Sequence, residues 1–341
     1  MNAQMLLALA GGLFALAVPP AGPALAQSSP QLLAVKMSFL VRPSGSAANF
    51  VASQDEGFFR KQGLDVSFIV PANPAAALQL VAAGTVQFAV AHSTDVILAR
   101  SRELPIVSLG TSHQFGDAGI MAPAAKNVRT PKALEGMTVG ITGIPANRVM
   151  LEYVLRVNKV DMSRVKLVPM GFTLAPALLA GRIDAIGDAI TWSEPITYNL
   201  AKGMNANDAS TYTFLPFYRH GAPRYYTFGV IVSESYLAAN ADVVRRFMRG
   251  WADGLEWTLK NQAKAVDMLI KRYPAVTRDP AIGVWKVLEN IVVSDETKAH
   301  GIGWQDPGVW RKQAEFMLEQ KLIPTAVDVS RAMSNEYLPG K

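Results

Sequence analysis

The chain alternates short apolar runs, rich in β-branched residues, with longer segments in which apolar positions recur every three or four residues. The first pattern is typical of buried strands and the second of amphipathic helices, so their alternation predicts an α/β fold. In the first part of the chain, the pattern predicts strands over 32–40, 64–70, 86–91 and 105–113 and helices over 47–61, 75–83 and 94–102.

The same alternation starts again near residue 120. It predicts strands over 137–142, 165–170 and 183–190 and helices over 146–158, 175–180 and 193–202. A further strand is expected over 225–233, followed by helices over 240–260, 262–272, 278–292 and 306–320. The tryptophans of these last helices recur at helical spacing, so we expect core positions for Trp251, Trp257, Trp285, Trp304 and Trp310.

One helix–glycine–strand unit occurs in both runs, as LQLVAAGTVQFAVA at 78–91 and as PALLAGRIDAIGDA at 176–189. Two similar units predict two lobes of one architecture. If the strand at 225–233 returns to the first sheet, the chain crosses between lobes near 115–122 and near 217–224, which places a ligand cleft between them. We therefore expect one lobe from 27–118 with 222–341, including the C-terminal helices, and a second lobe from 119–221.

The N-terminus carries the features of an export signal. Residues 5–18 form an uncharged apolar run that is too short to span a bilayer, and Ala24 and Ala26 supply the small residues that precede a cleavage site. We expect a signal peptide over 1–26, cleavage after Ala26 and a periplasmic mature protein. Since the chain has no cysteine, a lipid anchor on a cysteine and disulfides are excluded.

Composition excludes several classes of function. The chain has 33 basic and 27 acidic residues, but the bases are dispersed rather than clustered with aromatics, so we expect no nucleic-acid partner. The sequence has no HExxH, Walker A, GxSxG or GxGxxG motif, and its four histidines lack metal-ligand spacing. These absences favour a non-enzyme without cofactor or metal, and we expect a monomer.

Five segments, at 56–66, 77–90, 134–146, 177–186 and 225–269, together resemble periplasmic binding proteins of ABC importers. The resemblance spans about 33–275 and is strongest to the SsuA/THI5-like group, which is related to the thiamine-pyrimidine precursor binding proteins and the NMT1/THI5-like domain. It implies a type II periplasmic-binding-protein fold, with two α/β lobes, a central cleft and C-terminal helices. It also implies a small-molecule ligand that is delivered to an ABC permease and its ATPase.

Candidate ligand contacts lie where strands end and helices begin, because backbone N–H groups and hydroxyls point there toward a crevice. Ser93 and Thr94 are placed to cap a helix and touch ligand, and the 141–147 loop lines the cleft in the resembled family. Phe39 and Arg42 follow the first strand. Tyr225 and Tyr226 are neighbours on a strand and point to opposite faces, so we expect only one of them to contact the ligand. The full candidate set is Phe39, Arg42, His92, Ser93, Thr94, Thr142, Gly143, Ile144, Asn147, Trp192, Glu194, Tyr225 and Tyr226.

The residues leave three hypotheses about function open, two about the bound ligand and one about an enzyme. Pyrimidine binders of the resembled family carry an aromatic-x-Asn-x-Glu-like pattern near 190–194, of which this chain keeps Glu194 but has Ile190 and Trp192. The first hypothesis is therefore a flat nitrogen heterocycle, such as a thiamine-precursor pyrimidine, with Glu194 accepting from an amine. The second is an anion such as a sulfonate, nitrate or aromatic carboxylate, bound by the helix N-termini with Arg42 or Arg224. The third is a THI5-like pyrimidine synthase.

Overall fold

The computed structural model describes residues 31–71, 74–142, 145–171 and 173–340, and the structural statements below concern these ranges. The predicted signal peptide at 1–26 and its cleavage after Ala26 lie outside them, as do the candidate residues Gly143 and Ile144. In the part of the chain that the structure describes, no helix is long and apolar enough to cross a membrane.

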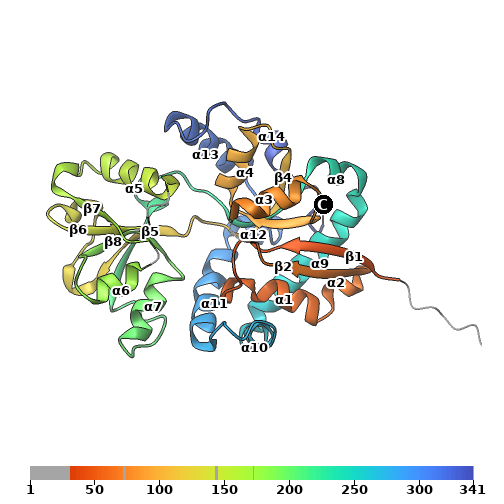
Figure 1. Ribbon diagram of the computed structural model, residues 1–341, viewed down its shortest axis with the longest axis horizontal. Helices are drawn as coiled ribbons and strands as arrows, with labels where there is room; N and C mark the ends of the chain where they lie inside the picture. Colours follow the sequence, from red (N-terminus) through yellow and green to blue (C-terminus); the bar gives the residue numbers. More distant parts are fainter. Residues whose placement is uncertain (1–30, 72–73, 143–144, 172, 341) are drawn as a thin grey trace, which may run out of the picture. The chain divides into compact units, whose positions relative to one another are not determined.

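The described strands form two five-stranded sheets with the same internal arrangement (Figure 1). The first sheet has the order β2-β1-β3-β10-β4 and the second the order β7-β6-β8-β5-β9. In each sheet the first three strands are parallel, whereas the fourth, β10 or β5, runs antiparallel to both of its neighbours. The strands are β1 (Leu33–Ser38), β2 (Leu64–Ile69), β3 (Phe88–Ala91), β4 (Ile106–His113), β5 (Ala118–Pro123), β6 (Thr138–Ile141), β7 (Lys166–Pro169), β8 (Ala185–Ile190), β9 (Tyr212–Pro216) and β10 (Thr227–Ser233).

Helices connect most of the strands and dominate the end of the chain. The α-helices are α1 (Ala48–Asp55), α2 (Phe58–Lys61), α3 (Pro74–Ala82), α4 (Ser93–Arg100), α5 (Pro145–Val157), α6 (Leu174–Leu179), α7 (Glu194–Ala201), α8 (Glu234–Ala239), α9 (Ala241–Lys260), α10 (Gln262–Arg272), α11 (Arg278–Val292), α12 (Asp295–His300), α13 (Pro307–Glu319) and α14 (Val329–Ala332). Short 3-10 turns occur at η1 (Gly45–Ala47), η2 (Ala124–Lys126), η3 (Pro131–Leu134), η4 (Met162–Arg164) and η5 (Phe217–Arg219).

The chain passes from the first sheet to the second through 114–117 and returns through 217–226. The strand predicted at 225–233 therefore does return to the first sheet, as β10 between β3 and β4. β5 begins where the first crossing ends, and β10 begins where the second crossing ends. An inner strand of each sheet therefore starts at the junction between the two sheets. The predicted α/β architecture of two similar halves is confirmed.

The repeated sequence unit has a structural basis in backbone pairing. Gly84 and Gly181 both have positive φ, of 70° and 66°, and each ends the helix that precedes the third strand of its sheet. Three residues after these glycines, Gln87 accepts from a backbone N–H of β1 at 2.8 Å, and Asp184 accepts from a backbone N–H of β6 at 2.9 Å. The backbone N–H of each returns a hydrogen bond to the same strand, at 3.0 and 2.7 Å. The two units thus fix β3 and β8 in equivalent places.

Some elements differ from the sequence prediction. The segment predicted as one helix over 47–61 is helical but not continuous, since it divides into η1, α1 and α2 and Gly57, with a φ of 78°, interrupts it. The strands β5 and β9 were not predicted. Both lie near the crossings, where glycine and proline interrupt the alternation of apolar and polar residues.

The amphipathic C-terminal helices α9, α10, α11 and α13 lie within one residue of their predicted ends. Trp251, Trp285 and Trp310 are fully buried, as predicted, while Trp257 and Trp304 are only partly buried against the core. Helices α1, α9 and α10 pack with one another and share a hydrophobic core with the first sheet. This packing supports the loop that follows β1, since η1 in that loop contacts α1 and α10.

Candidate functional site

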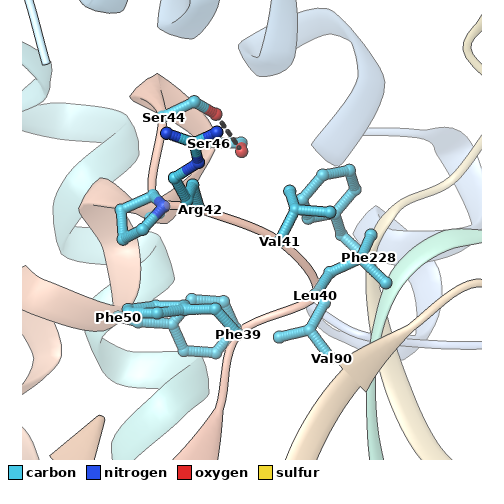
Figure 2. A pocket seen from close by; sticks show the side chains of 11 residues that line it. Phe39, Leu40, Val41, Arg42, Ser44, Ser46, Phe50, Val90 and Phe228 are labelled. Carbon is cyan, nitrogen blue, oxygen red and sulfur yellow. Dashed lines mark hydrogen bonds between the residues drawn. The ribbon is translucent and has the colours of Figure 1, made fainter. Parts of the chain in front are cut away.

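The loop after β1 lines a narrow hollow beside β3 and β10. Figure 2 shows this loop running from Phe39 to Ser46, with Val90 and Phe228 beside it. Phe39 is buried, stacks on Phe68 with ring centroids 5.1 Å apart and meets Phe50 edge-on at 6.2 Å. The hollow has a volume of about 20 Å³, which suits roughly one water but no ring.

Phe228 is the centre of an aromatic cluster at the start of β10. Its ring stacks on His113, with centroids 4.5 Å apart, and meets His92 and Trp192 edge-on at 5.4 and 5.7 Å. The backbone of Phe228 has a φ of 55°, in the left-handed region that a bulky residue rarely adopts. Its N–H donates to His92 Nδ1 at 3.3 Å, and its carbonyl accepts from the Ser112 hydroxyl at 3.1 Å. These hydrogen bonds hold the ring toward the junction of the two sheets.

Trp192 brings a ring to the cluster from the second sheet, because it lies two residues after the end of β8. Its indole Nε1 donates to Asp117 Oδ2 at 3.0 Å, and the backbone N–H of Thr191 donates to the Asp117 carbonyl at 2.8 Å. Asp117, at the end of the first crossing, is buried, and burial raises the pKa of its carboxyl. Burial also lowers the pKa of His113 to about 3, so this imidazole is neutral near pH 7. The crossing therefore fixes the orientation of Trp192.

Two further carboxyl groups lie at the edge of the second sheet. Asp188 accepts from the Thr142 N–H at 2.9 Å, from the Thr142 hydroxyl and from the Asn147 side chain. Glu194 accepts from the Ile190 N–H at 2.7 Å at the start of α7. Burial raises the pKa of both carboxyls, and the charge of Asp188 contributes to the raised pKa of Glu194. Glu194 lies two residues after Trp192, and neither carboxyl is among the residues that line the hollows at Phe228 and Trp192.

A larger hollow, of about 280 Å³, adjoins Trp192. One wall comes from the β1 loop at 43–45, another from Trp192 and the first turn of α7, and the third from the start of α11. Ser44 lines both this hollow and the one at Phe228. The two hollows are therefore adjacent, and we call the region bounded by the β1 loop, the aromatic cluster and the start of α7 the junction site.

Several sequence-predicted residues belong to this site. Phe39 and Arg42 line the Phe228 hollow, His92 and Trp192 contact the Phe228 ring, and Glu194 lies at the start of α7. The half-buried Thr142 and Asn147 contact Asp188 on the side of the second sheet. Thr94 is half-buried in the first turn of α4.

Ser93 and Tyr226 instead form a separate buried network. The Ser93 hydroxyl lies 3.0 Å from the Tyr226 carbonyl and 2.6 Å from Gln313 Oε1, and the Tyr226 hydroxyl accepts from the Asp306 N–H at 2.8 Å. Tyr225 is buried too, and its ring packs closely on Gly116 of the other crossing. Burial raises the pKa of Tyr226 to about 12. We therefore leave Ser93, Tyr225 and Tyr226 out of the proposed site.

The predicted capping role of Ser93 or Thr94 is wrong. Helix α4 begins at Ser93, so its N-cap is His92, whose backbone N–H donates to Asp95 Oδ2 at 3.1 Å. The Ser93 hydroxyl donates to the Tyr226 carbonyl and does not cap α4.

The two candidate anion-binding arginines differ in their surroundings. Arg224 donates to both carboxylate oxygens of Glu296 and, through Nε, to the Gln114 carbonyl at 2.9 Å. Arg42 is exposed beside the Phe228 hollow, with no ion pair among the described residues. No group of three His, Asp or Glu side chains within the described ranges is arranged to hold a metal ion.

Four residues of the site were not predicted from sequence: Asp117, His113, Asp188 and Phe228. Asp117 ends the first crossing and His113 precedes it, and the position of this crossing was predicted only roughly. Asp188 interrupts an apolar strand, and a charge in such a run signals a specific partner. Phe228 gives no such signal, because an aromatic residue is ordinary in a strand.

A family model described as NMT1/THI5 like matches residues 45–265. The chain belongs to this family. The arrangement of two similar sheets also matches solved structures: the periplasmic aliphatic sulphonate binding protein SsuA from Escherichia coli superposes with a TM-score of 0.66 at 14% identity, over 89% of this chain and 99% of that one.

Curated relatives of this NMT1/THI5-like chain differ in activity. A formylaminopyrimidine-binding protein of Halalkalibacterium halodurans is 31% identical over 63% of this chain, and the match spans 63% of that protein's own length. A riboflavin-binding protein of Chloroflexus aurantiacus is 26% identical over 95% of this chain and 91% of its own length. A 4-amino-5-hydroxymethyl-2-methylpyrimidine phosphate synthase of Saccharomyces cerevisiae is 22% identical over 72% of this chain and 73% of its own.

Proposed function

We propose that this chain is the extracytoplasmic solute-binding component of an ABC importer and captures a small, flat nitrogen heterocycle at the junction site. The observation that carries the proposal is the meeting of Phe228, from the first sheet, with Trp192, from the second, at 5.7 Å. Aromatic side chains favour stacked or edge-on contact with a flat ring. A ring that enters beside this pair gains such contacts from both sheets.

The hydrogen-bonding groups fit a ligand that carries N–H donors. Glu194, two residues after Trp192, and Asp188, whose charge acts on Glu194, supply carboxyl oxygens at the edge of the second sheet, and burial raises the pKa of both groups. An amino or amidine-like nitrogen would satisfy such acceptors, whereas an anion would add a second negative charge in a partly desolvated region. The pyrimidine- and riboflavin-binding relatives support the same class of ligand.

Closure of two lobes on the ligand explains why the site needs both sheets. We take 27–118 with 222–341 as one lobe and 119–221 as the other, connected through 114–117 and 217–226. Ligand binding would favour the arrangement in which both lobes contact it. A closed monomer would then deliver the ligand to a permease and its ATPase from the periplasm, after cleavage of the signal peptide.

The synthase is the second candidate, because the yeast relative carries that activity. A synthase would have to hold or consume a cofactor, and the purified protein would show additional absorbance or release a pyrimidine product. The importer proposal expects neither. An anion ligand is less well supported, since Glu296 already neutralises Arg224 and Arg42 is the one remaining arginine of that hypothesis.

A thermal-shift screen tests the proposal. Protein that has been unfolded, washed free of bound solute and refolded would be mixed with aminopyrimidines, riboflavin, small sulfonates and aromatic carboxylates. A ligand at 100 times its dissociation constant stabilises the folded state by about 2.7 kcal/mol, so a heterocycle of the right class raises the unfolding temperature clearly. A shift with sulfonates alone would contradict the proposed ligand class.

A further inference from the structure

A second hollow, separate from the junction site, lies beside the first crossing. It has a volume of about 460 Å³, within the range of roughly 300–1,000 Å³ that small-molecule sites occupy. Its walls come from the crossing at 115–116, from β9 with the segment after it, and from the end of α11. It shares no lining residue with the hollow at Trp192, because α11 contributes 280–284 to one and 286–291 to the other.

Aromatic rings form much of this hollow. Phe115 and Tyr218 come from different crossings and stack with centroids 5.4 Å apart and ring planes 21° from parallel. Tyr212 and Phe214 add two half-buried rings from β9. This arrangement offers a flat ligand contacts on more than one side.

The charged groups of the hollow are both cations. Lys286, on α11, and Arg219, after β9, line it and are exposed, and neither forms an ion pair with a described carboxylate. Arg219 also lies over the Tyr218 ring, 5.8 Å from its centroid. An anionic group would therefore bind here without first displacing an acidic side chain.

One buried acceptor beside the same hollow has no partner among the described residues. Asn207 Nδ2 donates to the Gly283 carbonyl at 2.9 Å, while Asn207 Oδ1 is buried and accepts no hydrogen bond from the described residues. A buried acceptor without a donor is costly, so a small side-chain shift that opens Asn207 Oδ1 to a ligand N–H or O–H would be favourable.

We propose that this hollow is a second binding site, for a small aromatic anion whose ring lies against the Phe115–Tyr218 pair. Its negative group pairs with Lys286 and Arg219, and a donor on the ligand satisfies Asn207 Oδ1. This site is independent of the ligand at Phe228, so either proposal stands if the other fails.

The test uses the aromatic sulfonate 8-anilinonaphthalene-1-sulfonate, titrated into the folded protein at low salt and followed by its fluorescence. Lys286→Glu and Arg219→Glu are each expected to weaken its affinity by roughly fivefold or more, since a repelling charge replaces an attracting one. Lys271→Glu is the matched control, because Lys271 is exposed on α10 and lines neither hollow, and it should change the affinity less than twofold. The uncharged analogue N-phenyl-1-naphthylamine should bind the wild type and Lys286→Glu equally.

Two results would overturn the proposal. One is an affinity for the sulfonate that is the same in wild type, Lys286→Glu and Arg219→Glu. The other is loss of sulfonate binding in Phe228→Ala with no loss in Lys286→Glu, which would place the probe at the junction site.

Discussion

At the scale of single residues, Phe228 combines an unfavourable backbone with a central side chain. A left-handed φ costs a residue with a Cβ roughly 1–2 kcal/mol, and here the φ is 55°. Hydrogen bonds to His92 and Ser112 and ring contacts with His113 and Trp192 offset that cost. Outliers of this kind are common at ligand sites, where the surrounding structure holds them.

This backbone predicts an unusual order of stability. Phe228→Gly should be more stable than Phe228→Ala by about 1 kcal/mol, because glycine adopts positive φ without steric cost. Urea unfolding measures both variants. At Val230, which has no positive φ, the order should reverse, with Val230→Ala more stable than Val230→Gly. Equal stability of the two Phe228 variants would show that φ contributes nothing.

The buried Asp117 carboxyl predicts a pH dependence. Because burial raises its pKa in the folded state, the unfolded chain loses this proton at lower pH than the folded chain does. Folding stability from this group therefore falls as pH rises from the ordinary value of 3.8 through the raised one. Asp117→Asn keeps an acceptor for Trp192 Nε1 and removes the titration. Its stability relative to wild type should increase from pH 4 to pH 7 in urea unfolding, and a difference that is constant with pH would contradict this.

Sequence reasoning found part of the site and missed its centre. His92, Trp192 and Glu194 were predicted because strand ends followed by helix starts mark the edge of a sheet. The contacts of Ser93 with Tyr226 and Gln313 were not predictable, since they join positions 133 and 220 residues apart. The positive φ of Phe228 depends on such long-range packing as well.

At the scale of elements, the repeated unit connects β3 to β1 in one sheet and β8 to β6 in the other through side-chain hydrogen bonds. Gln87 does this with an amide and Asp184 with a carboxylate, which also pairs with Lys126 at 2.6 Å. The shared part of the interaction is therefore the acceptor oxygen, not the charge. The ion pair is substantially exposed and contributes little.

Asp184→Asn should consequently cost little, about 0.5 kcal/mol or less, since it keeps an oxygen for the Thr138 N–H. Asp184→Ala should cost about 1–2 kcal/mol, because it leaves that N–H without its partner. Chemical denaturation of both variants measures the difference, with Gln87→Ala as the matched change in the other sheet. Equal losses for Asn and Ala at position 184 would assign the stabilisation to the ion pair.

Element prediction succeeded where the local pattern was strong. The C-terminal helices were placed closely because 20 residues of α9 repeat the apolar spacing, which continues through Gly250 and Gly254. β5 and β9 escaped prediction because their pairing is non-local: β5 lies between β8 and β9. The helix expected over 47–61 failed at Gly57, a residue that weakens a helix but does not by itself predict where it ends.

At the scale of the whole chain, two copies of one sheet arrangement face a shared junction, and two crossings connect them. Each sheet supplies an aromatic ring to that junction, and the crossing residue Asp117 orients the ring from the second sheet. A ligand that contacts both rings is sensitive to how the two halves are arranged, which is the property that an importer's binding protein requires.

Calorimetric titration of formylaminopyrimidine into ligand-free protein tests this account most directly. Wild type should bind it. Phe228→Ala and Trp192→Ala should each raise the dissociation constant tenfold or more, and a tenfold rise is equivalent to about 1.4 kcal/mol of binding free energy. Trp257→Ala is the control, because Trp257 is partly buried on α9 near Phe58 and Lys264, outside the site, and its affinity should equal that of wild type. Affinity unchanged in both Phe228→Ala and Trp192→Ala, or no binding of the pyrimidine to wild type, would contradict the account.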